Sequence, residues 1–154
     1  MSSLLKKKLT HSLKESIYML KLYTDAATKG NPGPSGIGFV IVGENQHEQV
    51  AVPLKGIYSN HEAEFIALIK GLSYVIEHNM ESELLQIFSD SKIVVSAVEK
   101  KYVKNESFKP YLKDLLSLLK YFEVYLIHWI PDAQNKGADN LARQALRKIN
   151  LSDS

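Results

Sequence analysis

Four acidic side chains in this sequence lie where an α/β chain can gather carboxylates for chemistry. Asp25 and Asp90 each end a short apolar run, and Glu64 and Asp139 each fall near the expected start of a helix. Sites in open sheets form outside the carboxyl ends of parallel strands, so the four could converge if the two strands are neighbours. Desolvated carboxylates repel one another unless they surround hard cations. Because oxygen-only sites suit Mg²⁺ or Mn²⁺, the pattern predicts a divalent-metal centre.

Each acid, taken singly, also fits a purely structural role. Asp25 and Asp90 could form turns, Glu64 could be an exposed helix residue, and Asp139 could stabilise the first turn of its helix. The metal-site hypothesis therefore depends on the elements that carry the four acids.

The spacing of apolar residues predicts these elements. Residues 16–25 are apolar on both faces, which predicts a central strand ending on Asp25, and 36–42 and 49–55 predict two more strands joined by a polar loop. A helix over 59–79 begins with Ser59 and Glu62 in capping-box spacing. The remaining elements are a strand over 83–90, a helix over 91–100 capped by Ser91, a helix opened by Pro110, a fifth strand over 123–130 and a last helix over 138–149.

The order of these elements predicts an α/β fold. Three successive strands favour an antiparallel meander, and the later alternation of strands with helices favours parallel pairing with right-handed crossovers. We therefore expect one five-stranded mixed sheet flanked by helices, with strands 1 to 3 antiparallel and strands 1, 4 and 5 parallel.

Composition limits the class of protein. With 154 residues, 45% of them hydrophobic, the chain is sized for one domain with its own core. It has no cysteine, which excludes disulfides and thiolate metal sites and favours a reducing compartment. No apolar run suits a membrane span and the N-terminus is unlike a signal peptide, so we expect a cytoplasmic protein. We expect the lysine-rich residues 1–16 to be a flexible leader and 17–154 to be the folded domain.

Four segments, in this order, resemble the motifs of the type 1 ribonuclease H family, in particular its compact bacterial and archaeal branch. The segments are TDAATKGNPGPSGIG, SNHEAEFIALIKGL, IFSDSKIVVSAV and WIPDAQNKGADNLARQAL. The resemblance implies a ribonuclease H-like catalytic domain that hydrolyses the RNA strand of RNA/DNA hybrids with two divalent ions. By position, its metal ligands and catalytic acids are Asp25, Glu64, Asp90 and Asp139.

The resemblance carries further expectations. Cleavage would leave 5′-phosphate and 3′-hydroxyl ends, and the protein would act as a monomer with no obligate protein partner. Asn31, Ser59, Asn60 and Ser91 are assigned to backbone and 2′-hydroxyl contacts with the hybrid, with Ser59 and Ser91 also capping their helices. The glycines of the loop GNPGPSG are expected to leave room for nucleic acid.

The sequence departs from the family's pattern at several positions. Ala26 replaces a frequent glycine, His61 a frequent asparagine and Lys92 a frequent glutamine. Many members have a histidine in the loop before the last aspartate, whereas this loop has none, so Asn135 is the expected polar partner of the site. The segment after Asp90 is too short for the basic protrusion of longer members. Lysines that could partly replace it as phosphate contacts are Lys100, Lys101, Lys104, Lys109 and Lys113.

Two other functions are compatible with these motifs. One is a hybrid-binding relative that has lost catalysis, and the other is a nuclease or transposase of the same broad fold that acts on DNA. A dinucleotide-binding fingerprint does not fit, because the glycines of GPSGIG precede a strand instead of opening a helix. The sequence has no P-loop motif, and its histidines lack zinc spacing.

Overall fold

A computed structural model describes residues 18–80 and 84–152, with side chains placed as far as residue 149. The order of strands and helices along these residues is the predicted one, with two short 3₁₀ turns in addition. The expected leader, residues 1–16, lies outside the described residues. The elements are β1 Met19–Thr28, β2 Ser35–Val42, β3 His47–Pro53, α2 Asn60–Glu77, β4 Leu84–Ser89, α3 Lys92–Lys100, η1 Glu106–Phe108, α4 Lys109–Leu119, β5 Tyr125–Trp129, η2 Asp132–Gln134 and α5 Lys136–Ser152.

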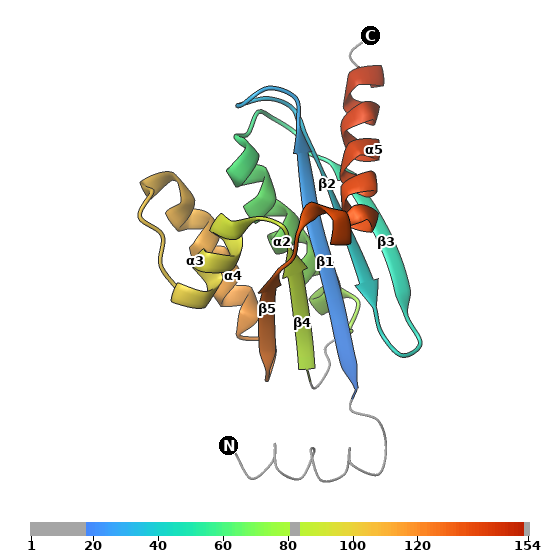
Figure 1. Ribbon diagram of the computed structural model, residues 1–154, viewed down its shortest axis with the longest axis vertical. Helices are drawn as coiled ribbons and strands as arrows, with labels where there is room; N and C mark the ends of the chain where they lie inside the picture. Colours follow the sequence, from blue (N-terminus) through green and yellow to red (C-terminus); the bar gives the residue numbers. More distant parts are fainter. Residues whose placement is uncertain (1–17, 81–83, 153–154) are drawn as a thin grey trace.

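The five strands form one mixed sheet in the order β3-β2-β1-β4-β5, with β1 at its centre (Figure 1). β1 pairs antiparallel with β2, and β2 antiparallel with β3. β1 pairs parallel with β4, and β4 parallel with β5. The predicted fold class is confirmed, because the pairing directions are those expected from the order of elements.

The two faces of the sheet are covered by different helices. Leu22 of β1 and Ile87 of β4 point into a buried core that they share with Phe65 and Leu72 of α2 and Leu115 of α4. α5 lies across the other face, over β1, β2 and β3, as Figure 1 shows. None of the helices within residues 18–80 and 84–152 is long and apolar enough to cross a bilayer.

Glycines in β2 bring α5 close to the sheet. A Cβ on Gly38 would lie 2.5 Å from the carbonyl oxygen of Ala138 and 2.6 Å from the amide nitrogen of Ala142, and Gly36 meets the same helix equally closely. Gly36, the last glycine of the loop expected to admit nucleic acid, therefore has an internal packing role. Since Gly38 pairs with Asp25, the first turn of α5 is held directly over that carboxylate's strand.

β1 differs from the prediction at its end. The strand was expected to stop at Asp25, but it continues to Thr28 because residues 25–28 remain paired with β2. Pairing with β4, in contrast, stops at Thr24 opposite Ser89. Asp25 is thus the first residue of β1 that lies beyond the edge of β4, where the sheet opens toward the loops.

Candidate active site

The structure brings the four predicted acids together at this opening. Asp25 follows the last β1–β4 pair, and Asp90 comes directly after β4. Glu64 lies in the second turn of α2, and Asp139 in the first turn of α5. The charges of Asp90, Asp139 and Glu64 all act on the carboxyl group of Asp25, which shows that the four side chains share one electrostatic environment.

Asp25 is the innermost of the four. It is only 8% exposed, and burial together with the charge of Asp90 raises its pKa to about 8, against the opposing effect of the Ala26 N–H that it accepts at 2.8 Å. Burial also raises the pKa of Asp90, which is further affected by the charges of Asp132 and Glu64. The centre of the site therefore resists carrying its full negative charge.

Asn135 connects the strands that bear these two acids. Its side chain is 1% exposed, and its Nδ2 donates to the carbonyl oxygen of Thr24 at 2.9 Å and to Oδ2 of Asp90 at 3.4 Å. The backbone carbonyl oxygen of Asn135 accepts the N–H of Asp139 at 3.1 Å. Asn135 is thus hydrogen-bonded to Asp90, to Asp139 and to Thr24, the residue before Asp25. These contacts agree with its expected role as the polar partner of the site.

Glu64 and Asp139, the other two acids, are each hydrogen-bonded to a basic side chain. Oε2 of Glu64 is hydrogen-bonded to Nδ1 of His61 at 3.2 Å, and Oδ1 of Asp139 accepts from Nε of Arg143 at 3.1 Å. Both pairs are partly exposed, so each contributes little to stability. Their i,i+3 and i,i+4 spacing was visible in the sequence, although neither pair was predicted.

The donor set suits a hard divalent cation, although no ready-made cage is present. The site offers four carboxylates that oppose one another's ionisation, and beside them the buried Oδ1 of Asn135 has no hydrogen-bond partner. Across residues 18–80 and 84–152, however, no three acidic or histidine side chains are placed so that they could hold an ion as they stand.

The residues expected to contact nucleic acid fall into two groups. Asn31, Ser59 and Asn60 lie together, because Oδ1 of Asn31 accepts the N–H of Asn60 at 3.0 Å. Ser59 caps α2 in a complete capping box with Glu62, as predicted. Ser91 caps α3 through the N–H of Val94, also as predicted, but it is 6% exposed and offers little surface to a ligand.

Three contacts near the site were not foreseen. The indole N–H of Trp129 donates to the backbone carbonyl of Asp90 at 3.0 Å, and the ammonium group of Lys92 lies 5.0 Å from the centre of the Trp129 ring. Tyr111 of α4 donates to Glu62 at 2.9 Å and thereby supports the start of α2. No sequence pattern reveals any of these contacts, because each joins elements that pack only in the folded chain.

Comparison with known proteins identifies relatives with this arrangement of motifs. A family model described as "Reverse transcriptase-like" matches residues 23–145. A protein of Enterococcus faecalis named as hydrolase EbsB is 52% identical over 85% of this chain and 96% of its own length. A ribonuclease H of Trichodesmium erythraeum is 30% identical over 86% of this chain and 91% of its own. Among solved structures, LC11-RNase H1 in complex with RNA/DNA hybrid matches with a TM-score of 0.77 and 26% identity, covering 84% of this chain and 98% of that one.

Proposed function

The chain belongs to the type 1 ribonuclease H family, and from this we propose that it hydrolyses the RNA strand of RNA/DNA hybrids with divalent ions held by Asp25, Glu64, Asp90 and Asp139. The observation that carries the proposal is the burial of Asp25 among three further carboxylates. A stable fold gains nothing from such a cluster unless cations neutralise it. The similarity to the ribonuclease H of Trichodesmium erythraeum, and the hybrid bound in the structure of LC11-RNase H1, support the choice of reaction and substrate.

In this mechanism the protein's own side chains hold the carboxylates in position and orient them. Asp25, which lies next to β2 and beyond the end of β4, would be one of the residues that hold the ions, and Asp90 would be kept in place by Asn135 and Trp129. Two bound Mg²⁺ or Mn²⁺ ions would supply an activated water and stabilise the leaving 3′ oxygen, which gives 5′-phosphate and 3′-hydroxyl ends. Ser89 and Thr24, both buried, help exclude water from beneath the carboxylates.

We assign recognition of the hybrid to the start of α2 and the loop beside it. Asn31, Ser59 and Asn60 lie on that edge, where amide and hydroxyl groups can distinguish a 2′-hydroxyl from hydrogen. Ser91, which is buried, would contribute mainly by capping the start of α3. We also propose that residues 17–154 form the catalytic domain, that it works as a monomer, and that the cysteine-free chain acts in the reducing cytoplasm.

Cleavage assays on matched duplexes test the proposal. The purified chain would be incubated with labelled RNA/DNA hybrid, duplex DNA or duplex RNA, each with Mg²⁺, Mn²⁺ or chelator. We expect cleavage of the hybrid's RNA strand alone, only with a divalent ion, and its loss in Asp25→Asn but not in the exposed control Asp114→Asn. Hybrid binding without cleavage would identify a noncatalytic relative, and cleavage of duplex DNA would contradict the assigned substrate.

A further inference from the structure

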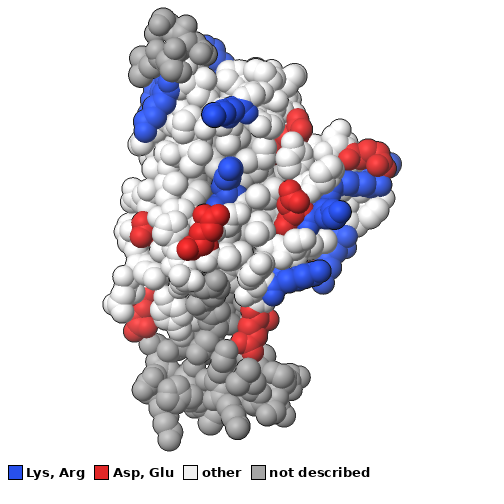
Figure 2. Space-filling model, turned by 180° about the vertical axis from the view of Figure 1, so that it is seen from behind, with Lys and Arg blue, Asp and Glu red and all other residues white. Residues whose placement is uncertain are grey.

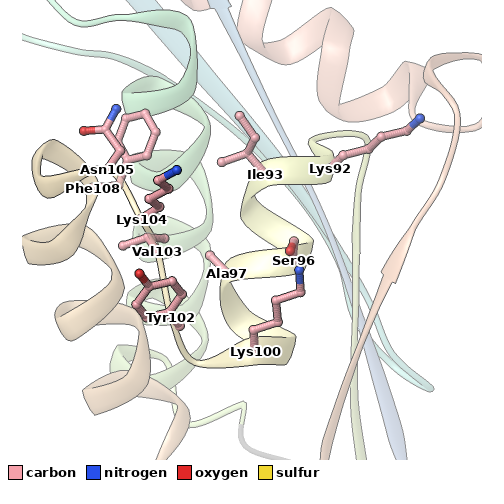
Figure 3. A pocket seen from close by; sticks show the side chains of 10 residues that line it. All are labelled: Lys92, Ile93, Ser96, Ala97, Lys100, Tyr102, Val103, Lys104, Asn105 and Phe108. Carbon is pink, nitrogen blue, oxygen red and sulfur yellow. The ribbon is translucent and has the colours of Figure 1, made fainter.

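A groove lies between α3 and the segment that leads into α4. Figure 3 shows it from close by, with α3 on one side and residues 102–108 on the other. Its volume is about 390 Å³, which is enough for one or two large side chains. None of the four acids lines it.

The floor of the groove is apolar. Ile93 and Ala97 from α3 face Val103 and Phe108 from the connecting segment (Figure 3). Ile93 is 37% exposed and Tyr102, at the margin, is 61% exposed, so the groove presents apolar surface directly to solvent. Contiguous apolar surface with a polar margin is a mark of an interaction site.

The margin of the groove is basic. Lys100 and Lys104 lie on opposite sides of it, and neither forms an ion pair with any residue that the structure describes. Residues 92–105 contain four lysines and one acid, Glu99. An uncompensated pair of ammonium groups at the edge of an apolar groove attracts carboxylates.

We propose that this groove docks an acidic peptide segment of a partner protein, with a large apolar side chain buried on the floor and carboxylates paired with Lys100 and Lys104. A nucleic-acid backbone is the other polyanion that lysines attract, but phosphates and sugars would leave Ile93 and Phe108 without an apolar counterpart. A peptide that has both a large apolar side chain and carboxylates can contact the apolar floor and the basic margin at the same time. None of the four acids lines the groove, and the proposal does not depend on the proposed reaction.

Peptide binding to the full chain tests the proposal. The probe is a short fluorescein-labelled peptide of Asp and Glu residues with a central Phe and Leu, followed by fluorescence anisotropy at physiological salt. One comparison peptide has Ser in place of Phe and Leu, and another has Asn and Gln in place of the acids. We expect saturable binding of the probe and a loss of about tenfold or more in affinity for each comparison peptide.

Matched variants of the protein test whether the probe binds in this groove. Lys100→Glu with Lys104→Glu, and separately Ile93→Ser, should each weaken binding of the probe about tenfold, because they remove the charge pairing or the apolar contact. Lys70→Glu with Lys148→Glu makes the same change in net charge at exposed positions elsewhere and should leave binding nearly unchanged. Melting temperatures would be measured for every variant to show that it folds.

Three results would overturn the proposal. Equal binding of the peptide without Phe and Leu would show attraction by charge alone. Equal weakening by the control pair would remove the groove as the site. Displacement of the probe by RNA/DNA hybrid, with hybrid affinity lost in the Lys100 and Lys104 variant but unchanged in Ile93→Ser, would assign the groove to nucleic acid.

Discussion

Asp25 is a carboxyl group whose ionisation the folded chain opposes. Burial and the charge of Asp90 raise its pKa from an ordinary 3.8 to about 8. Between these values the folded chain binds more protons than the unfolded chain, so the free energy of unfolding falls as pH rises through this range. The buried carboxyl of Asp25 therefore destabilises the protein near neutral pH, where the folded chain keeps it largely protonated unless a cation compensates its charge.

Asp25→Asn tests directly whether the buried carboxyl group of Asp25 destabilises the protein. The amide has the same shape and no charge, so in the presence of chelator the variant should melt at a higher temperature than the wild type at pH 8. The difference should shrink toward zero below about pH 3, where the wild-type carboxyl is protonated in both the folded and the unfolded state. Thermal melts across this range measure it, with exposed Asp114→Asn as the control. A constant difference at every pH would contradict the raised pKa.

Asn135→Ala tests whether the asparagine positions the acids or only stabilises the fold. The substitution removes the donor to Asp90 and leaves the buried carbonyl of Thr24 unpaired. Partners that orient metal ligands typically affect metal affinity 10- to 100-fold, so the Mn²⁺ concentration for half-maximal thermal stabilisation should rise about tenfold or more. Asn140→Ala, at an exposed position of α5, is the control. A lower melting temperature with an unchanged Mn²⁺ midpoint would leave Asn135 a purely structural role.

The individual acids could be predicted from sequence because each lies at the end of a recognisable element. Asp90 follows an apolar strand and precedes the capping residue Ser91, and both features survive in the structure. Trp129 could not be predicted as a support for Asp90, because its hydrogen bond crosses 39 residues. Arg143 lies one helical turn after Asp139, a spacing that makes such a pair predictable.

At the scale of elements, the position of α5 depends on the glycines of β2. A methyl group at Gly38 would overlap the backbone of α5 at Ala138 and Ala142, and backbone cannot move aside as a side chain can. Because α5 carries Asp139, displacement of the helix also moves one wall of the candidate site.

Gly38→Ala should therefore lower stability and cleavage together. We expect a loss of about 1–3 kcal/mol or more in the free energy of unfolding, the usual cost of forcing extra atoms into packed structure, with a marked fall in hybrid cleavage. Gly137→Ala is the matched control, since its Cβ would meet only Val40, at 3.4 Å, and Ala favours a helix. Urea denaturation and cleavage rates measure both effects. Full stability in Gly38→Ala would show that α5 is not held as closely as the structure indicates.

The elements were predictable where local chemistry determines them, as with the capping box of Ser59 and Glu62. The end of β1 was predicted wrongly. Residues 26–28 carry no strong apolar pattern of their own, and they stay extended because β2 pairs with them. Such pairing depends on a partner strand and cannot be read from one segment alone.

At the scale of the whole molecule, charge is unevenly distributed. The sequence has 19 basic and 17 acidic residues, yet basic side chains gather over the projecting part that contains α3 and α4, as Figure 2 shows from behind. Lys101 and Lys113 lie in this region, are exposed, and do not line the groove between α3 and the connecting segment. A small net charge therefore does not prevent a polyanion from being attracted to one side.

Replacing Lys101 and Lys113 with Gln tests whether this side meets the phosphates of the hybrid. Each lysine that neutralises a phosphate releases counterions and adds about 0.9 to the slope of log affinity against log salt concentration for a duplex. If both lysines contact phosphates, the double variant should bind the RNA/DNA hybrid more weakly at low salt, and the slope should be shallower by about 2. Titrations of hybrid in chelator over a range of salt concentrations measure the slope, and Lys70→Gln with Lys148→Gln should leave it unchanged. An unaltered slope in the Lys101 and Lys113 variant would mean that the hybrid lies elsewhere and that these lysines serve only solubility.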